Sequence, residues 1–175
     1  IAHMLEPLGD VRELASAAEK LAKGKALQAR EQGNALGLLL KPRGGSEYRC
    51  RIRWDDDNSL AFLGKDQERF RDGALPRGLA HELDSLWQRA AEIFDREKAP
   101  AEFAGLWRSL LETTLKKKRQ GGGAEGVAEA LRKELIAELT PAAPANRAGN
   151  DTVRARLDLL QAALWLSGRI EGAAG

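Results

Sequence analysis

The chain is poor in cysteine, methionine and aromatic residues: its 175 residues include one Cys, one Met and only 5% Phe, Trp and Tyr. With Cys50 alone, neither an intrachain disulfide nor a metal site built from several cysteines can form. A lone thiol is compatible with a reducing compartment, so we expect a cytoplasmic protein. Long apolar runs are also missing. A membrane-spanning helix needs about 18 to 20 apolar residues, so we expect no membrane-spanning segment and no membrane partner.

The charges nearly cancel, and the apolar content is ordinary. There are 28 Lys and Arg against 26 Asp and Glu, which gives a net charge of +2, and 43% of the residues are hydrophobic. A disordered chain has fewer apolar residues and a larger net charge, so we expect a folded protein. The length suits one domain of ordinary size, or one domain with a small appendage.

Residues 1–4 are expected to be an expression-tag remnant and an initiator Met, because Ile1-Ala2-His3 precedes Met4, the only Met. No apolar core of a signal peptide follows Met4, so we expect no secretory signal.

The periodicity of the apolar residues predicts the fold. Residues 10–32 have the spacing of a helix, with Asp10 and Glu13 suited to cap its first turn and Gly33-Asn34 suited to end it. Three short stretches follow at 36–40, 47–54 and 60–63, separated by turns at 42–45 and 55–58. They predict a three-stranded antiparallel meander with one buried face.

Helical stripes dominate the rest of the chain, over residues 79–94, 103–111, 127–139 and 153–170. We therefore expect a helix-dominated α+β protein: an N-terminal helix, the small three-stranded antiparallel meander, and a bundle of about four helices. The predicted parts are residues 5–64 for the first helix and sheet, 65–78 for a linker, 79–140 for the bundle, 141–149 for a second linker, and 150–172 for an apolar C-terminal helix.

Basic residues gather on one side of the middle strand. Arg49, Arg51 and Arg53 alternate with apolar residues, so their side chains stand about 6.7 Å apart on one face. Guanidinium groups bind phosphates through paired hydrogen bonds. Because the apolar side chains take the buried face, we expect the arginine face to lie in water, ready for an anion or nucleic acid. The alternative is an ordinary solvated face whose arginines form salt bridges to neighbouring elements.

A second basic cluster, residues 116–119, ends the predicted helix at 103–119. Cations at the carboxyl end of a helix complement its dipole, which explains one or two of these residues. Four in a row point in all directions and lead into Gly121-Gly122-Gly123, as a phosphate-binding arm would. The ranges 41–53 and 108–119 each have a net charge of +4, so the remaining residues carry −6. This segregation favours a polyanionic partner.

Other candidates for chemistry have simpler explanations. Asp55, Asp56 and Asp57 suit a hairpin turn and lack the rest of a calcium loop. His81 is predicted on the outer face of its helix and Cys50 on the buried face of its strand, so neither is expected to catalyse a reaction or bind a metal. We expect no cofactor, no metal site and no enzymatic activity. Acid–base chemistry by carboxylates that meet only in space stays open.

The last predicted helix is apolar almost all round in its C-terminal half. Such a helix is either central to a bundle or half exposed for a partner, including a second copy of the chain.

Two functions follow from these patterns. The first is a non-catalytic nucleic-acid-binding or accessory subunit that contacts the phosphates of DNA or RNA through Arg43, Arg49, Arg51, Arg53, Lys116, Lys117, Lys118 and Arg119. The second is a protein-interaction or scaffold module that uses Leu159, Trp165, Leu166 and Ile170 of the last helix.

Overall fold

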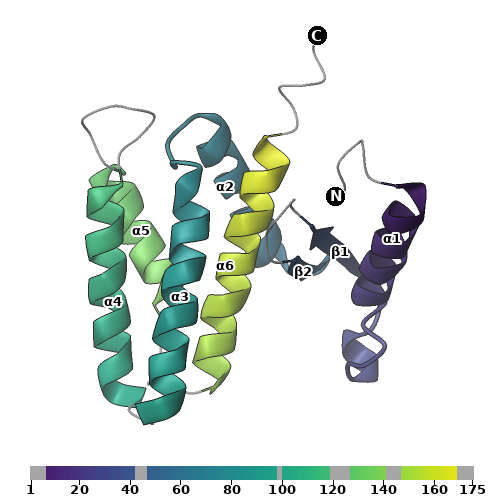
Figure 1. The fold of residues 1–175 in the computed structure, drawn as a ribbon, viewed down its shortest axis with the longest axis horizontal. Helices are drawn as coiled ribbons and strands as arrows, with labels where there is room; N and C mark the ends of the chain where they lie inside the picture. Colours follow the sequence, from purple (N-terminus) through teal and green to yellow (C-terminus); the bar gives the residue numbers. More distant parts are fainter. Residues whose placement is uncertain (1–6, 42–46, 98–99, 119–126, 141–146, 169–175) are drawn as a thin grey trace. The chain divides into compact units, whose positions relative to one another are not determined.

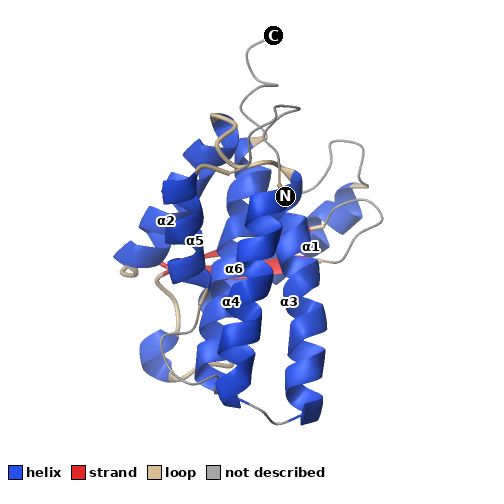
Figure 2. Cartoon of the chain, turned by 90° about the vertical axis from the view of Figure 1, so that its left-hand side faces the viewer, coloured by secondary structure: helices blue, strands red, loops and turns tan. Residues whose placement is uncertain are grey.

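The computed structural model describes residues 7–41, 47–97, 100–118, 127–140 and 147–168. Helices dominate these residues and two strands pair antiparallel, so the predicted helix-dominated α+β class is confirmed (Figures 1 and 2). The elements are α1 (Leu8–Lys23), the short 3-10 helix η1 (Ala29–Glu31), β1 (Ala35–Leu40), β2 (Tyr48–Arg53), α2 (Asp57–Arg71), α3 (Gly78–Glu97), α4 (Pro100–Lys117), α5 (Glu129–Leu139) and α6 (Arg147–Ser167). The chain divides into two compact units, Ile1–Gly64 and Lys65–Gly175, and the boundary falls within α2.

α1 ends earlier than its apolar pattern predicts. The expected helix reached residue 32, but α1 ends at Lys23 because Gly24 has a left-handed backbone, with φ 57° and ψ 37°. Glycine reaches this conformation without the clash that a Cβ would cause. The N–H of Gly24 donates to the carbonyl of Lys20 at 3.1 Å, which completes a helix C-cap.

β1 and β2 form the sheet of the first unit. Leu36 lies opposite Ile52 and Gly37 lies opposite Arg51. α1 packs on β1 so closely that a Cβ built on Gly37 would lie 2.3 Å from the carbonyl oxygen of Ala18. A glycine within a strand is typical of such a close backbone approach. The missing side chain of Gly37 therefore sets the distance between α1 and the sheet.

The predicted third strand is wrong, and so is the meander. Residues 60–63 lie in α2, which begins where a hairpin turn was expected. Asp56 caps this helix: its Oδ1 accepts a hydrogen bond from the N–H of Ser59 at 3.1 Å, and its carbonyl accepts one from the N–H of Leu60 at 3.1 Å. A run of four apolar residues fits a buried strand or a helix face equally well, so periodicity could not separate the two.

α2 also fills the first half of the segment that was predicted as a linker, residues 65–78. It stays helical to Arg71, and both Asp66 and Phe70 are buried. The polar sequence suggested an exposed connection, but these two side chains point into the second unit. Residues 65–71 are therefore helical, where the sequence suggested at most one helical turn.

The second unit is a helical bundle. α3 packs on α4 and α6, and α5 packs on the same two helices (Figure 1). Trp107 is fully buried and donates its Nε1–H to the carbonyl of Leu139 at 2.7 Å, which ties α4 to α5. The ring of Trp87 meets that of Trp107 edge to face, with centroids 4.9 Å apart, and so joins α3 to the same cluster.

Buried charges attach the end of α2 to this bundle, which therefore contains more than the four helices predicted. Arg156 of α6 lies 2.6 Å from the carboxylate of Asp66 and 2.5 Å from that of Glu138 in α5. Arg69 contacts the other carboxylate oxygen of Asp66 at 3.0 Å and also pairs with Glu134. Removing one partner of a buried ion pair leaves an uncompensated charge, so loss of any one of these side chains is expected to destabilise the unit.

We predict that Gly37→Ala destabilises the first unit by about 1 to 3 kcal/mol, the usual cost of forcing extra atoms into a packed contact. Gly9→Ala is the control, because a Cβ on Gly9 of α1 meets nothing within 4 Å. The control is expected to be neutral, or to stabilise by up to about 1 kcal/mol through its higher helix propensity. Hydrogen exchange of the Leu38 and Ile52 amides in the two variants measures the difference, and equal exchange rates would contradict the close approach.

Candidate functional site

The arginine face of β2 is the face that α1 covers. Arg51 stands opposite Gly37 and Arg53 opposite Ala35, so these side chains share the face on which α1 approaches Gly37. The prediction that this face lies open to water is therefore wrong for Arg51 and Arg53, which are half-buried, whereas Arg49 is exposed. The small residues of β1 leave room for a helix beside the arginines, while Ile52 on the opposite face is also buried. Alternation along a single strand could not reveal that both faces are covered.

Arg51 binds the carboxyl end of α1 and the loop that follows it. Its Nε donates to the carbonyl of Ala22 at 3.2 Å, and its Nη2 donates to the carbonyls of Glu31 and Gly33 at 2.6 and 2.9 Å. The last carbonyls of a helix have no partner within the helix, and the planar guanidinium group can serve several acceptors at once. Arg51 thus donates three hydrogen bonds to backbone carbonyls within the first unit.

Arg53 and Arg49 form ion pairs with carboxylates close to them in sequence. Arg53 donates from Nε and Nη2 to the two carboxylate oxygens of Asp55, at 2.6 and 2.5 Å. This hydrogen bonding lowers the pKa of Asp55 and raises the pKa of Arg53. Arg49 pairs with Glu47, yet its side chain stays 67% exposed. Of these three arginines, Arg49 alone presents most of its side chain to solvent; Arg43 lies outside the described residues.

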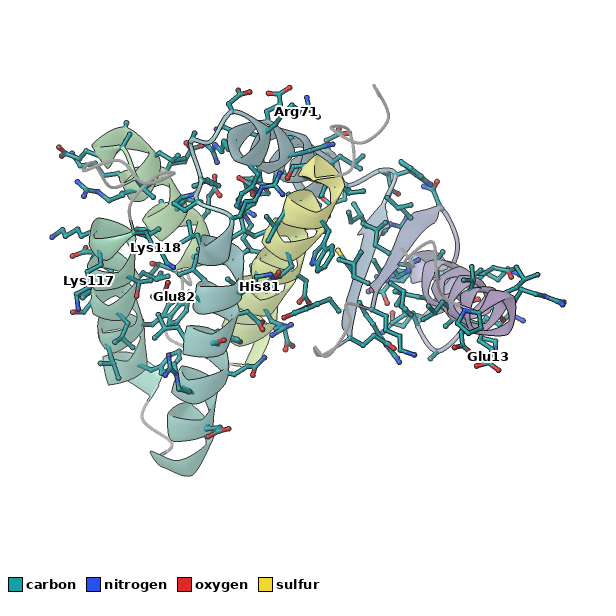
Figure 3. The ribbon with its side chains drawn as sticks, turned by 45° about the horizontal axis from the view of Figure 1, so that its top comes forward. Glu13, Arg71, His81, Glu82, Lys117 and Lys118 are labelled. Carbon is teal, nitrogen blue, oxygen red and sulfur yellow. The ribbon has the colours of Figure 1, made fainter. Side chains whose placement is uncertain are left out.

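The lysines at the end of α4 are arranged differently. Lys116 and Lys117 are exposed, and the side chain of neither has an ion-pair or hydrogen-bond partner among the residues that the structure describes. Lys118 forms an ion pair with Glu82 of α3, as the labelled side chains of Figure 3 show. Its Nζ also lies 3.6 Å from the position that a Cβ on Gly78 would take, at the first residue of α3. Arg119 lies outside the described residues.

α6 contributes mainly to the core. Leu159 is 5% exposed, and the next residues, Leu160–Leu164, are buried as well. Trp165 and Leu166 are half-buried, while Ile170 lies outside the described residues. Side chains in these positions pack within the chain, so the described part of α6 does not offer the exposed apolar patch that a partner surface requires.

The minor candidates lie where the sequence predicts. His81 is exposed on α3 (Figure 3), and Cys50 is buried. Within the described ranges, no group of three His, Cys, Asp or Glu side chains is placed to hold a metal ion. None of the described helices combines the length and the apolar character needed to cross a membrane.

A polar cluster lies between α3 and α6, and the sequence pattern did not predict it. Arg154 donates to Asp84 of α3 and to Asp158 of its own helix, both at 2.6 Å, and Gln88 donates to Asp84 at 2.9 Å. Burial raises the pKa of Asp158; Arg154 opposes this rise and the charge of Asp84 adds to it. The spacing of Arg154 and Asp158 was the one available signal, because Asp84 lies 70 positions from its partner.

No protein-family model matches the chain, and neither a curated protein sequence nor a solved structure is significantly similar to it.

We predict that Arg51→Ala costs about 2 to 3 kcal/mol of the stability of the first unit, because it leaves three carbonyls without their charged donor. Arg49→Ala, on the same face and largely exposed, is the matched control and is expected to change stability by less than about 0.5 kcal/mol. Urea unfolding followed through the exchange of strand amides compares the two. Similar losses in both variants would contradict a special role for Arg51.

The carboxyl groups of Asp158 and Glu134 are predicted to affect stability in opposite directions with pH. The pKa of Asp158 is raised in the folded protein, so stability from this group is lost as pH rises through that pKa. The pKa of Glu134 is lowered, mainly by its hydrogen bond with Lys65, so its contribution is present at neutral pH and is lost as pH falls.

Asp158→Asn should therefore raise stability at about pH 7, and Glu134→Gln should lower it; both differences should shrink towards about pH 4. Urea unfolding at the two pH values measures each difference. A loss of stability in Asp158→Asn at neutral pH would show that its ion pair with Arg154 outweighs the cost of burial.

Proposed function

We propose that the protein is a non-catalytic nucleic-acid-binding protein or accessory subunit that contacts phosphates through the carboxyl-terminal turn of α4. The observation that carries this proposal is the exposure of Lys116 and Lys117 without a partner among the described residues. One lysine is enough to complement the dipole of a helix end. A second exposed lysine, beside the pair of Lys118 and Glu82, leaves positive charge available for an anion.

The amino end of α3 supports the same proposal. This helix has no acidic residue in its first turn, and Lys118 lies beside its first residue, Gly78. The amino end of a helix carries partial positive charge, so it favours anions in addition to the lysines. The strand arginines are not part of the proposed site, because Arg51 and Arg53 are hydrogen-bonded inside the first unit.

Two or three phosphate contacts give weak, salt-sensitive binding. Each contact with duplex DNA changes the slope of log K against log salt by about −0.9, so a slope near −2 to −3 is expected. Contacts of lysines with phosphates carry no sequence information, and we therefore propose binding without sequence preference.

The alternative proposal, a protein-interaction module that uses α6, has less support. It requires an exposed apolar helix face, whereas Leu159 is buried and Trp165 is half-buried. A protein partner would need another surface of the chain.

We predict that Lys116→Ala/Lys117→Ala weakens binding of a fluorescent oligonucleotide at about 50 mM salt and reduces the salt slope by about 2. The matched control is Lys20→Ala/Lys25→Ala, which removes the same charge from two exposed lysines elsewhere. Fluorescence anisotropy over a salt series measures both variants. Absence of binding by the unaltered protein at low salt would refute the proposal, and equal weakening in the control pair would show a mere effect of net charge.

A further inference from the structure

The outer edge of β2 carries backbone groups that face away from β1. The N–H of Trp54 donates to the carbonyl of Asn34 at 2.9 Å, and the register pairs Leu36 with Ile52 and Leu38 with Cys50. In an antiparallel pair, hydrogen-bonded and non-hydrogen-bonded residue pairs alternate. The even-numbered residues are therefore bonded across the two strands, and the N–H and C=O groups of Arg49 and Arg51 point outward.

Nothing in the described part of the chain pairs with this edge. Among the described residues the sheet consists of β1 and β2, and residues 60–63 lie in α2. α1 packs mainly on β1 and touches β2 far less. Its bond to β2 is made by the side chain of Arg51, which leaves the outward backbone groups of that residue unused.

The side chains along β2 define what could pair there. Arg49 is 67% exposed, and its ion pair with Glu47 lies at the surface, where such pairs contribute little. On the other face Cys50 and Ile52 are apolar and buried, so an added strand would extend a buried face there. A second copy of β2 would place arginines against arginines, and like charges on adjacent strands repel. An incoming strand with carboxylates on the Arg49 face and apolar residues on the Cys50 face would complement both.

We propose that the outer edge of β2 binds an extended acidic peptide of a partner protein, in which acidic and apolar residues alternate, as a third strand of the sheet. The main-chain hydrogen bonds of Arg49 and Arg51 would provide affinity, and the alternating side chains would provide specificity. This inference does not depend on the lysines of α4, so Lys116→Ala/Lys117→Ala is expected to bind the peptide unchanged.

The test uses a synthetic peptide of about eight residues that alternates Glu with Val, a length that spans one strand. Two-dimensional NMR of the whole chain is expected to show shifts confined to β2 and its neighbours, and slower hydrogen exchange at the amides of Arg49 and Arg51. A peptide with Lys in place of Glu is expected not to bind. Unchanged spectra with the Glu peptide, or equal shifts with the Lys peptide, would overturn the proposal.

Two variants distinguish the contribution of the Arg49 backbone to peptide binding from that of its side chain. Arg49→Ala keeps the outward N–H and is expected to weaken binding by about two- to fivefold, the value of one cross-strand charge pair. Arg49→Pro removes that N–H without breaking a bond to β1, since proline is tolerated at an outward edge position. In this variant the peptide is expected no longer to slow the hydrogen exchange of the Arg51 amide. If the proline variant fails to fold, Arg49→Glu decides: it must reverse the preference towards the Lys peptide, and an unchanged preference would overturn the proposal.

Discussion

The first unit depends on the hydrogen bonds of one guanidinium group. No residue of α1 is fully buried, so the helix cannot be held by a deep apolar core of its own. A two-stranded sheet is itself marginal unless a helix packs on it. Arg51 joins these weak parts, because it binds the end of α1 and the loop before β1 at the same time. The absent side chain of Gly37 lets the helix come close enough for these bonds to form.

The second unit is also held by the hydrogen bonds and ion pairs of arginines, and one of these arginines is buried. Arg156 is almost completely buried between carboxylates of α2 and α5, and Arg154 bridges α3 and α6. A buried charge is costly unless it is paired and hydrogen-bonded, so removing either carboxylate partner of Arg156 would be destabilising. A chain rich in arginine thus need not have a strongly basic surface. Because the arginines of β2 are mostly paired within the chain, we place the proposed polyanion site at the lysines of α4 instead.

The parts of the fold that depend on interactions between residues close in sequence were predicted best. The stripe of Leu79, Leu83 and Trp87 correctly predicted α3 and its buried face, because helical spacing is a local property. Residues 60–63 were assigned to a strand because a short apolar run carries no period of its own. In the structure they are helical, and Asp56 caps the start of that helix. The end of α1 was also missed, since a glycine within a helical pattern weakens or ends a helix depending on its backbone angles.

By itself the sequence determined that the chain is mainly helical, that β2 alternates between arginines and apolar residues, and that lysines end α4. These features follow from spacing within one element, which the order of residues expresses directly. Only the tertiary structure decided which basic groups reach solvent. The acceptors of Arg51 lie 18 to 29 positions away, and those of Arg156 come from two other helices. The packing of segments distant in sequence determines which hydrogen-bond partners a side chain has. The solvent exposure of an arginine therefore cannot be predicted from the sequence of its strand alone.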